Sequence, residues 1–140
     1  MADRVQKVSY CYMKVPNRAG AGERILSQLR EGGVDLLVFS GFPIRGGNAQ
    51  LDFAPQDMAA FRKVVRKHGW RVSAVKRAFL VTGTDRLGAT HRHIRKLADA
   101  KINITAVDAV AAGKGRYGVI LWVKPAVYGR AARALGAVSN

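Results

Sequence analysis

The stretch Val15-Pro16-Asn17-Arg18-Ala19-Gly20 decides the fold, because a similar stretch, Thr84-Asp85-Arg86-Leu87-Gly88, follows at an offset of 68 residues. Each copy comes after an apolar alternating run and before a helix-like segment. A polar residue, an arginine, an apolar residue and a glycine recur in the same order. Self-similarity at a fixed spacing indicates a duplicated structural unit. The sequence therefore predicts two copies of one βαββα unit.

Apolar residues keep the same spacing through the helix and strand that follow each stretch. The matching pairs are Leu26 with Ile94, Leu29 with Leu97, Val34 with Ile102, and Leu36 with Ile104. Beyond the next hairpin we expect an offset of 70, with the pairs Leu51 and Leu121, Phe53 and Val123, and Pro55 and Pro125. A two-residue difference in one loop would explain the change, because loops tolerate insertions.

Hydrophobic periodicity then predicts the elements of each repeat. In the first repeat we expect strands at 5–14, 34–40 (largely buried), 49–54 and about 70–76, with helices at 21–31 and after Pro55. In the second repeat we expect strands at 78–83, 102–111 and 117–123, with helices at 87–100 and after Pro125. This order predicts an α+β fold of two tandem ferredoxin-like βαββαβ units, with antiparallel sheets and helices on one face. The expected domains are 1–77 and 78–140, joined without a flexible linker.

The second repeat has no room for a full fourth strand before the sequence ends at Asn140. In this fold the fourth strand flanks the first, so its loss would leave an open edge at residues 78–83. Open sheet edges are usually covered. We therefore expect another copy of the chain to cover this edge and form a homodimer.

The 140-residue chain carries 24 Lys and Arg against 9 Asp and Glu, a formal net charge of +15. The excess is spread over both repeats. Such charge attracts nucleic acid, anionic membrane surfaces or acidic ligands. It is equally compatible with an arginine-rich solvated surface, so charge alone selects no partner.

The apolar runs of the sequence are short. No apolar run approaches the roughly 18 residues that span a membrane, and residues 1–7 lack the apolar region of a signal peptide. Cys11 is the only cysteine, so no internal disulfide can form. We expect a cytoplasmic protein without a membrane partner, in which Cys11 is an inert strand residue.

The order of strand, Asn/Asp-Arg-x-Gly loop, helix and second strand resembles the ACT domain across nearly the whole chain. That family consists of small βαββαβ regulatory modules that often bind amino acids where two modules meet. Lys101-Ile102-Asn103-Ile104 matches the family's start of the second strand, and Gly33-Val34-Asp35-Leu36 matches with Asp in place of Asn. The family often has proline at the positions of Ala19 and Leu87, which is a departure.

The resemblance implies ligand contacts from the loop after the first strand and from the start of the second strand. These positions are Asn17, Arg18, Ala19, Gly20 and Asp35 in the first repeat, and Asp85, Arg86, Leu87, Gly88 and Asn103 in the second. The free N–H groups at a helix start suit a carboxylate, and glycine permits close approach. Each polar residue is also an ordinary turn or cap residue. No cofactor is implied.

A basic segment supports a competing interpretation. It holds seven cations, no acid and one tryptophan: Arg62, Lys63, Arg66, Lys67, Trp70, Arg71, Lys76 and Arg77. Contacts from such cations to phosphates would give salt-dependent nucleic-acid binding, although a solvated helix face has the same composition. His91 and His93 lack metal-ligand spacing, and we expect His93 to lie on a basic surface.

The sequence contains no nucleophile motif and no phosphate-binding loop, so we expect no enzyme activity. We expect a regulatory protein that binds an amino acid or similar carboxylate between ACT-like units. Its effect would act on a separate regulated protein or on self-assembly. A basic nucleic-acid-binding module and an assembly module with vestigial ligand sites remain alternatives.

Overall fold

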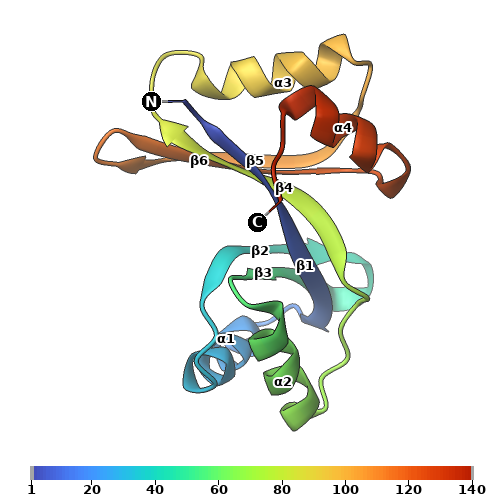
Figure 1. Ribbon diagram of the computed structural model, residues 1–140. Helices are drawn as coiled ribbons and strands as arrows, with labels where there is room; N and C mark the ends of the chain where they lie inside the picture. Colours follow the sequence, from blue (N-terminus) through green and yellow to red (C-terminus); the bar gives the residue numbers. More distant parts are fainter. Residues whose placement is uncertain (1, 140) are drawn as a thin grey trace. The chain divides into compact units, whose positions relative to one another are not determined.

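The computed structural model describes residues 2–139 and confirms the α+β class (Figure 1). Its elements are β1 (Arg4–Pro16), α1 (Ala21–Glu31), β2 (Leu36–Ile44), β3 (Asn48–Pro55), α2 (Met58–His68), β4 (Lys76–Thr84), α3 (Ala89–Asp99), β5 (Ile104–Gly113), β6 (Arg116–Val123) and α4 (Tyr128–Leu135). Two short 3-10 helices, at Arg45–Gly47 and Pro125–Val127, precede β3 and α4. No helix among the described residues combines the length and the apolarity needed to cross a membrane.

The chain divides into two compact units that interleave in sequence. Residues 9–76 form one unit, here called the inner unit, and residues 1–8 with 77–140 form the other, called the outer unit. The sequence-based division at residues 77 and 78 placed residues 1–8 with the first repeat, whereas the structure groups them with the second. The reason is packing, because Val5 belongs to the hydrophobic core that contains Phe79 and Val81.

In the inner unit the strands follow the order β2-β3-β1, and both neighbouring pairs are antiparallel. Helices α1 and α2 lie on one side of these strands (Figure 1). The core gathers Cys11, Leu29 and the fully buried Phe53 and Phe61. The expectation that β2 is largely buried is wrong, because β2 is an edge strand and the Phe39 side chain is 42% exposed.

The predicted fourth strand of the inner unit is not a regular strand. Residues 70–75 have no strand assignment, but they still flank β1 through Ser73. The Ser73 N–H donates to the Tyr12 carbonyl at 2.8 Å, and the Tyr12 N–H donates to the Ser73 hydroxyl at 2.9 Å. A side-chain oxygen therefore replaces a carbonyl as the acceptor, which interrupts the backbone ladder.

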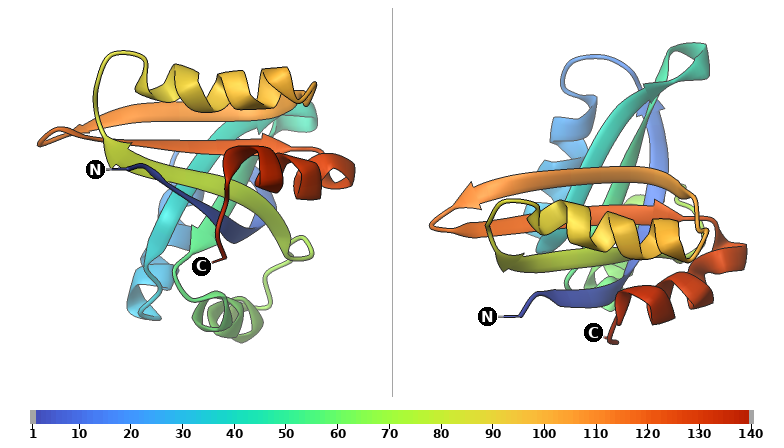
Figure 2. Two further views of the ribbon diagram at one scale, coloured as in Figure 1. Left: turned by 45° about the horizontal axis from the view of Figure 1, so that its top comes forward. Right: turned by 90° about the horizontal axis from the view of Figure 1, so that it is seen from above.

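In the outer unit the first residues of the chain supply the missing fourth strand. Helices α3 and α4 lie on the same side of the strands β4, β6 and β5 (Figure 2). Residues 4–8 of β1 lie beside β4. On their other side, the Val138 N–H donates to Val5 and the Lys7 N–H donates to Val138, each at 2.9 Å. The edge at residues 78–83 is thus not open, and the inference that a second chain covers this edge is wrong.

The strand registers show that one offset relates the two units throughout their sheets. Cys11 pairs with Phe53 in the inner unit, and Phe79 pairs with Leu121 in the outer unit. The offset is therefore 68 on both strands, so Phe53 corresponds to Leu121 and not to Val123. The predicted change to 70 is wrong, because the hairpins of the two units have the same length.

Candidate functional site

The two predicted loops have the same backbone geometry. The Asn17 N–H donates to the Gly47 carbonyl at 2.9 Å, and the Asp85 N–H donates to the Gly115 carbonyl at 2.8 Å. Gly20 precedes α1 with a φ of 89°, and Gly88 precedes α3 with a φ of 75°. L side chains rarely adopt this conformation, which explains why a glycine closes both loops.

The loop side chains are available to a ligand. All residues at 17–20 and 85–88 are exposed, including Ala19 and Leu87. Within residues 2–139, none of the side chains of Asn17, Arg18, Asp85 and Arg86 has a hydrogen-bond or ion-pair partner. The space beside Gly20 and Gly88 is also open, because a Cβ atom at either position would meet nothing within 4 Å. The approach to both glycines is therefore open.

Asp35 lies far from the loop at residues 17–20 within the inner unit. Strand β1 ends opposite Asn48, at the start of β3, whereas β2 begins opposite Pro55, at the end of β3. Seven residue steps along a strand separate these points by roughly 20 Å. The structure does not bring Asp35 together with this loop.

Asn103 has the same relation to the loop at residues 85–88 of the outer unit. Strand β4 ends opposite Arg116, at the start of β6, and β5 begins opposite Val123, at its end. When two strands run in the same direction, the end of one and the start of the other lie at opposite ends of the sheet, measured along the strands. A single unit therefore offers the loop and the start of its second strand as two separate surfaces.

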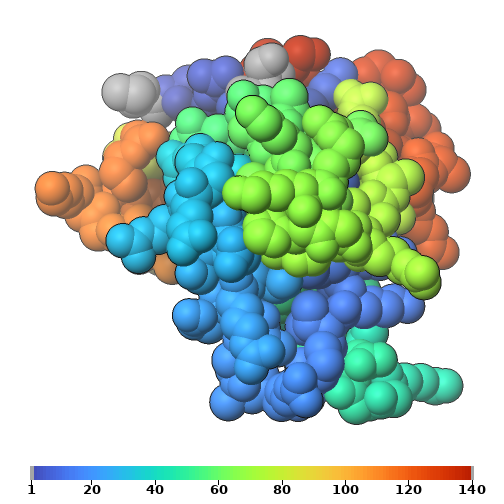
Figure 3. Space-filling model, turned by 90° about the horizontal axis from the view of Figure 1, so that it is seen from below, coloured from blue at the N-terminus to red at the C-terminus, as the bar shows by residue number. Residues whose placement is uncertain are grey.

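The basic segment is divided between free cations and cations that contact aromatic rings. Lys76 lies over the Tyr12 ring at 5.8 Å, and Arg77, in the outer unit, lies over the Tyr128 ring at 4.7 Å. Trp70 stacks on His68 with ring centroids 5.0 Å apart. The remaining cations are exposed and have no ion-pair partner among the described residues; they are Arg62, Lys63, Arg66, Lys67 and Arg71. Figure 3 shows the face on which α2 and the residues after it gather.

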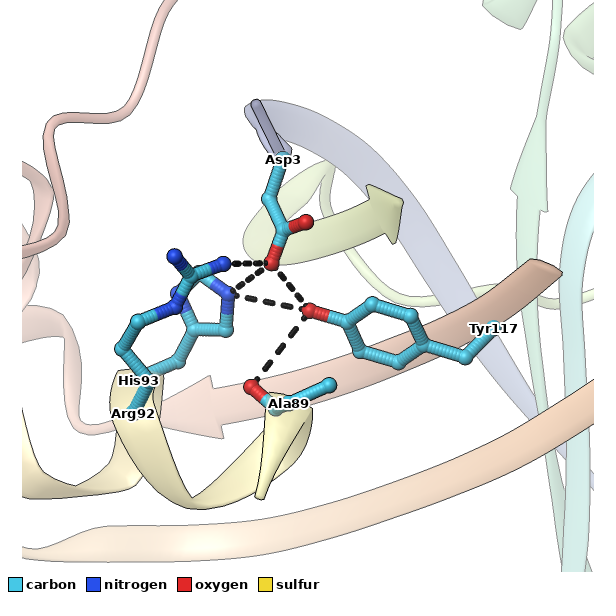
Figure 4. A network of polar contacts seen from close by, with 5 residues as sticks. All are labelled: Asp3, Ala89, Arg92, His93 and Tyr117. Carbon is cyan, nitrogen blue, oxygen red and sulfur yellow. Dashed lines mark hydrogen bonds and ion pairs between the residues drawn. The ribbon is translucent and has the colours of Figure 1, made fainter. Parts of the chain in front are cut away.

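A buried polar cluster in the outer unit was missed by the sequence analysis (Figure 4). Three side chains converge on one carboxylate oxygen, Oδ2 of Asp3. The Arg92 guanidinium and the Tyr117 hydroxyl both donate to it, and the His93 Nε2 lies 2.7 Å away. The His93 Nε2 is also 3.1 Å from the Tyr117 hydroxyl, which approaches the Ala89 carbonyl at 3.5 Å. Ala89, Arg92 and His93 belong to the first two turns of α3. The cluster therefore adjoins the start of this helix, directly after the loop at residues 85–88.

The cluster keeps the Asp3 carboxylate ionised. Burial by itself would raise the pKa of Asp3, but hydrogen bonds from Tyr117, His93 and Arg92 outweigh it and lower the pKa to about 2. Burial and the bond to Asp3 raise the pKa of Tyr117 to about 12. Since Asp3 is ionised and can only accept, the Nε2 atom of His93 carries a hydrogen and donates.

The fit of Asp3 is close but incomplete. Its side chain is 3% exposed, and its second oxygen, Oδ1, has no hydrogen-bond partner among residues 2–139. The buried Nδ1 of His93 likewise has none within the described chain. A Cβ atom added at Gly83 would lie 2.1 Å from Oδ1. Only glycine at this position of β4 leaves room for the carboxylate.

His93 was expected on a basic surface, and this is wrong, because the residue is only 2% exposed. The spacing offered the correct interpretation, since His93 is one helical turn from both Ala89 and Leu97, which are also buried. Nothing near Asp3 in the sequence indicates its role. Its partners are 89 to 114 residues away along the chain.

Known proteins resemble this chain in structure, but no sequence match was found. No protein-family model matches the sequence, and no curated protein matches it. A protein from Bacteroides thetaiotaomicron is similar in structure with a TM-score of 0.79 and 11% identity, over 94% of this chain and 88% of that one. The regulatory subunit of aspartate kinase from Thermus thermophilus, in a ligand-free form, is similar with a TM-score of 0.59 and 15% identity, over 96% and 93%.

The regulatory subunit of aspartate kinase from Thermus flavus gives the same result, with a TM-score of 0.58 and 19% identity over 96% of this chain and 94% of that one. At these identities the likeness concerns the fold alone. It confirms two tandem ferredoxin-like units. The Asp3 cluster and the loop residues are properties of this chain and do not follow from the likeness.

Proposed function

We propose that this chain, whose fold is that of the ACT-domain regulatory subunits of aspartate kinase, is a non-catalytic regulatory protein that binds an amino acid or a similar small carboxylate. Two of the similar structures are regulatory subunits of aspartate kinase, which supports regulation in place of catalysis. The observation that carries the proposal is the duplicated loop, with an exposed polar residue, an exposed arginine and a left-handed glycine before a helix.

In this proposal the ligand carboxylate accepts hydrogen bonds from the N–H groups in the first turn of α1 or α3. The Ala21 and Ala89 N–H groups donate to the Arg18 and Arg86 carbonyls, and the N–H groups that follow them in each first turn have no partner within their own helix and carry partial positive charge. The Asn17 side-chain oxygen or the Asp85 carboxylate would accept from the ligand ammonium group. Arg18 and Arg86 add positive charge that favours a carboxylate ligand.

Asp35 and Asn103 contribute to such a site only from a different unit than the loop, because within each unit they lie at the opposite end of the sheet. We propose that this unit belongs to a second copy of the chain, so that the protein forms a homodimer and the ligand acts on self-association. A ligand shifts such an equilibrium only by binding one state better than the other. A separate regulated protein would recognise the state that the ligand favours.

We place this protein in the cytoplasm. Cys11 is unpaired and buried, and burial raises the pKa of its thiol, so the side chain stays protonated and unreactive. An unpaired, unreactive cysteine fits a reducing compartment.

The test is thermal unfolding of the full chain against the twenty amino acids and related carboxylates. A ligand at 100 times its Kd stabilises the native state by about 2.7 kcal/mol, which is a clear shift in Tm. The shift should shrink in Asn17→Ala and in Asp85→Ala, and it should persist in Asp108→Ala, which changes an exposed carboxylate on β5. Sedimentation with and without the hit measures self-association. A panel without any selective shift would contradict the proposal.

Nucleic-acid binding is the second candidate, and the unpaired cations on α2 favour it. Labelled RNA and DNA should then bind with a log K that falls linearly with log salt. The double variant Arg62→Ala, Arg66→Ala should lose about two phosphate contacts, so the slope of log K against log salt should become less steep by about two. Binding that is insensitive to both changes would remove α2 from consideration. If no small molecule shifts Tm and no nucleic acid binds, the remaining interpretation is an assembly module with vestigial ligand sites.

A further inference from the structure

The buried cluster at the start of α3 has the composition of a ligand site with the ligand already in place. We propose that Arg92, His93 and Tyr117 form a carboxylate-binding site, which Asp3 of the same chain occupies and from which a free small carboxylate displaces it. This site is separate from the exposed loop residues, and the proposal stands or falls independently of the amino-acid panel above.

The donor set fits a carboxylate. A guanidinium, an imidazole N–H and a phenol all point at Oδ2 of Asp3. Charge-assisted hydrogen bonds of this kind are among the strongest that proteins form. His93 and Tyr117 are buried, whereas the Arg92 side chain is 42% exposed. The arginine therefore reaches the cluster from solvent and marks the side from which a ligand would enter.

The shape of the site favours a planar group over a tetrahedral one. The Asp3 carboxylate lies against the backbone of β4, where a Cβ atom at Gly83 would be only 2.1 Å from Oδ1 and 2.6 Å from Cγ. The carboxylate therefore occupies a narrow space against the strand. Phosphate and sulfate carry two more oxygens out of the plane and would meet the strand. The site should therefore select small carboxylates.

Asp3 is a tethered occupant that satisfies the site only in part. Its Oδ1 and the Nδ1 of His93 are buried without a partner among residues 2–139. An unpaired buried acceptor costs free energy, so Asp3 gains less from the site than a better-fitting carboxylate would. Its advantage is the tether, which raises its effective concentration to the millimolar range or above.

Displacement of Asp3 would have a structural consequence, because Asp3 directly precedes β1. Residues 4–8 lie beside β4 and exchange hydrogen bonds with Val138. Releasing Asp3 removes the anchor at the start of this strand. Carboxylate binding is thereby coupled to exposure of the edge of the outer unit.

The first experiment measures thermal unfolding of the full-length Asp3→Ala variant in rising sodium acetate, with sodium chloride at equal ionic strength as the reference. The substitution should lower Tm by roughly 2 to 8 °C. Acetate, and not chloride or sulfate, should restore much of this loss with saturating concentration dependence. The Asp3→Ala, Tyr117→Phe double variant keeps the ring but lacks one donor, so its apparent acetate affinity should fall by about tenfold.

The second experiment uses the wild-type protein and does not depend on the variants. Amide hydrogen exchange at Lys7, whose N–H donates to Val138, should accelerate in acetate at several hundred millimolar, roughly the concentration needed to compete with a tethered group. Chloride should leave this rate unchanged.

Gly83→Ala supplies the matched control, because its methyl group fills the position of the carboxylate. In this variant Lys7 should exchange quickly in all salts, and acetate should not stabilise the protein. The proposal is overturned if acetate protects Asp3→Ala no better than chloride does. It is also overturned if acetate protects the Tyr117→Phe double variant equally well, or if acetate leaves Lys7 exchange in the wild type unchanged.

Discussion

The inner and outer units use one backbone plan but fill the same place in it with opposite chemistry. Between the start of the first helix and the strands that it covers, the inner unit has apolar side chains. The outer unit has a polar cluster at the same position. The equivalent positions at the 68-residue offset are Val15 and Gly83, Ile25 and His93, and Ala49 and Tyr117. Val15 and Ile25 pack against the inner core, whereas Gly83, His93 and Tyr117 surround Asp3.

The difference shows what a duplicated fold constrains. The left-handed glycines and the loop hydrogen bonds are the same in both units, so the backbone turn is fixed. The side chains packed beneath the turn differ between the two units. The apolar side chains of the inner unit need no hydrogen-bond partner, whereas the buried donors of the outer unit need an acceptor. The chain supplies that acceptor from its third residue.

The strongest way to break the comparison is to truncate an equivalent core leucine in each unit. Leu29 and Leu97 are 1% and 0% exposed, so Leu29→Ala and Leu97→Ala should each cost about 2 to 5 kcal/mol of unfolding free energy. Urea titrations of single-tryptophan variants that retain Trp70 or Trp122 report on the inner and the outer unit, respectively. Each truncation should lower the midpoint of its own unit more. Equal shifts of both probes in both variants would mean that the units unfold together.

A double-mutant cycle between Asp3 and His93 sharpens the comparison further. His93→Ile introduces the residue found at the equivalent inner position and should cost about 2 kcal/mol, because a buried carboxylate loses a donor. Combined with Asp3→Ala, the loss should be smaller than the sum, with a coupling of about 1 to 3 kcal/mol. The matched control is Ile25→Ala, which should be additive with Asp3→Ala. A coupling near zero between Asp3 and His93 would contradict the buried contact.

The smallest effect concerns acid. The pKa of Asp3 is lowered from 3.8 to about 2, so its contribution to stability is complete above pH 4 and is lost as the pH falls through 2. The loss should be on the order of 1 to 2 kcal/mol. Wild type minus Asp3→Asn, measured by urea unfolding between pH 5 and pH 2, isolates it. A difference that stays constant over this range would show that Asp3 has an ordinary pKa.

Most of the fold could be predicted because it rests on local patterns. The four α-helices and six strands follow from apolar periodicity and from the glycines that close them. The offset of 70 failed because Leu121 and Pro125 resemble Leu51 and Pro55 by residue type, whereas strand pairing is decided by register. The expected burial of β2 failed because apolar composition does not distinguish an edge strand from a central one.

The residues of the candidate site likewise fall into those that a local sequence pattern predicts and those that depend on the tertiary structure. The loops at residues 17–20 and 85–88 could be located because each is a local turn with its own glycine. The separation of Asp35 from the first loop follows only from sheet topology. The Asp3 cluster could not be found from the sequence, because it depends on which segment flanks β4. A contact over 114 residues has no local signal.

Strand β1 is shared between the units, and this has a consequence for the order in which the chain folds. On the ribosome, residues 9–76 emerge as a complete set and are expected to fold first, while residues 4–8 wait for β4 and for Val138 near the end of the chain. A circular permutant that begins at Arg77 and joins the old termini would make both units contiguous. Such a rearranged gene should shorten the longest loop that folding has to close and speed completion of the outer unit.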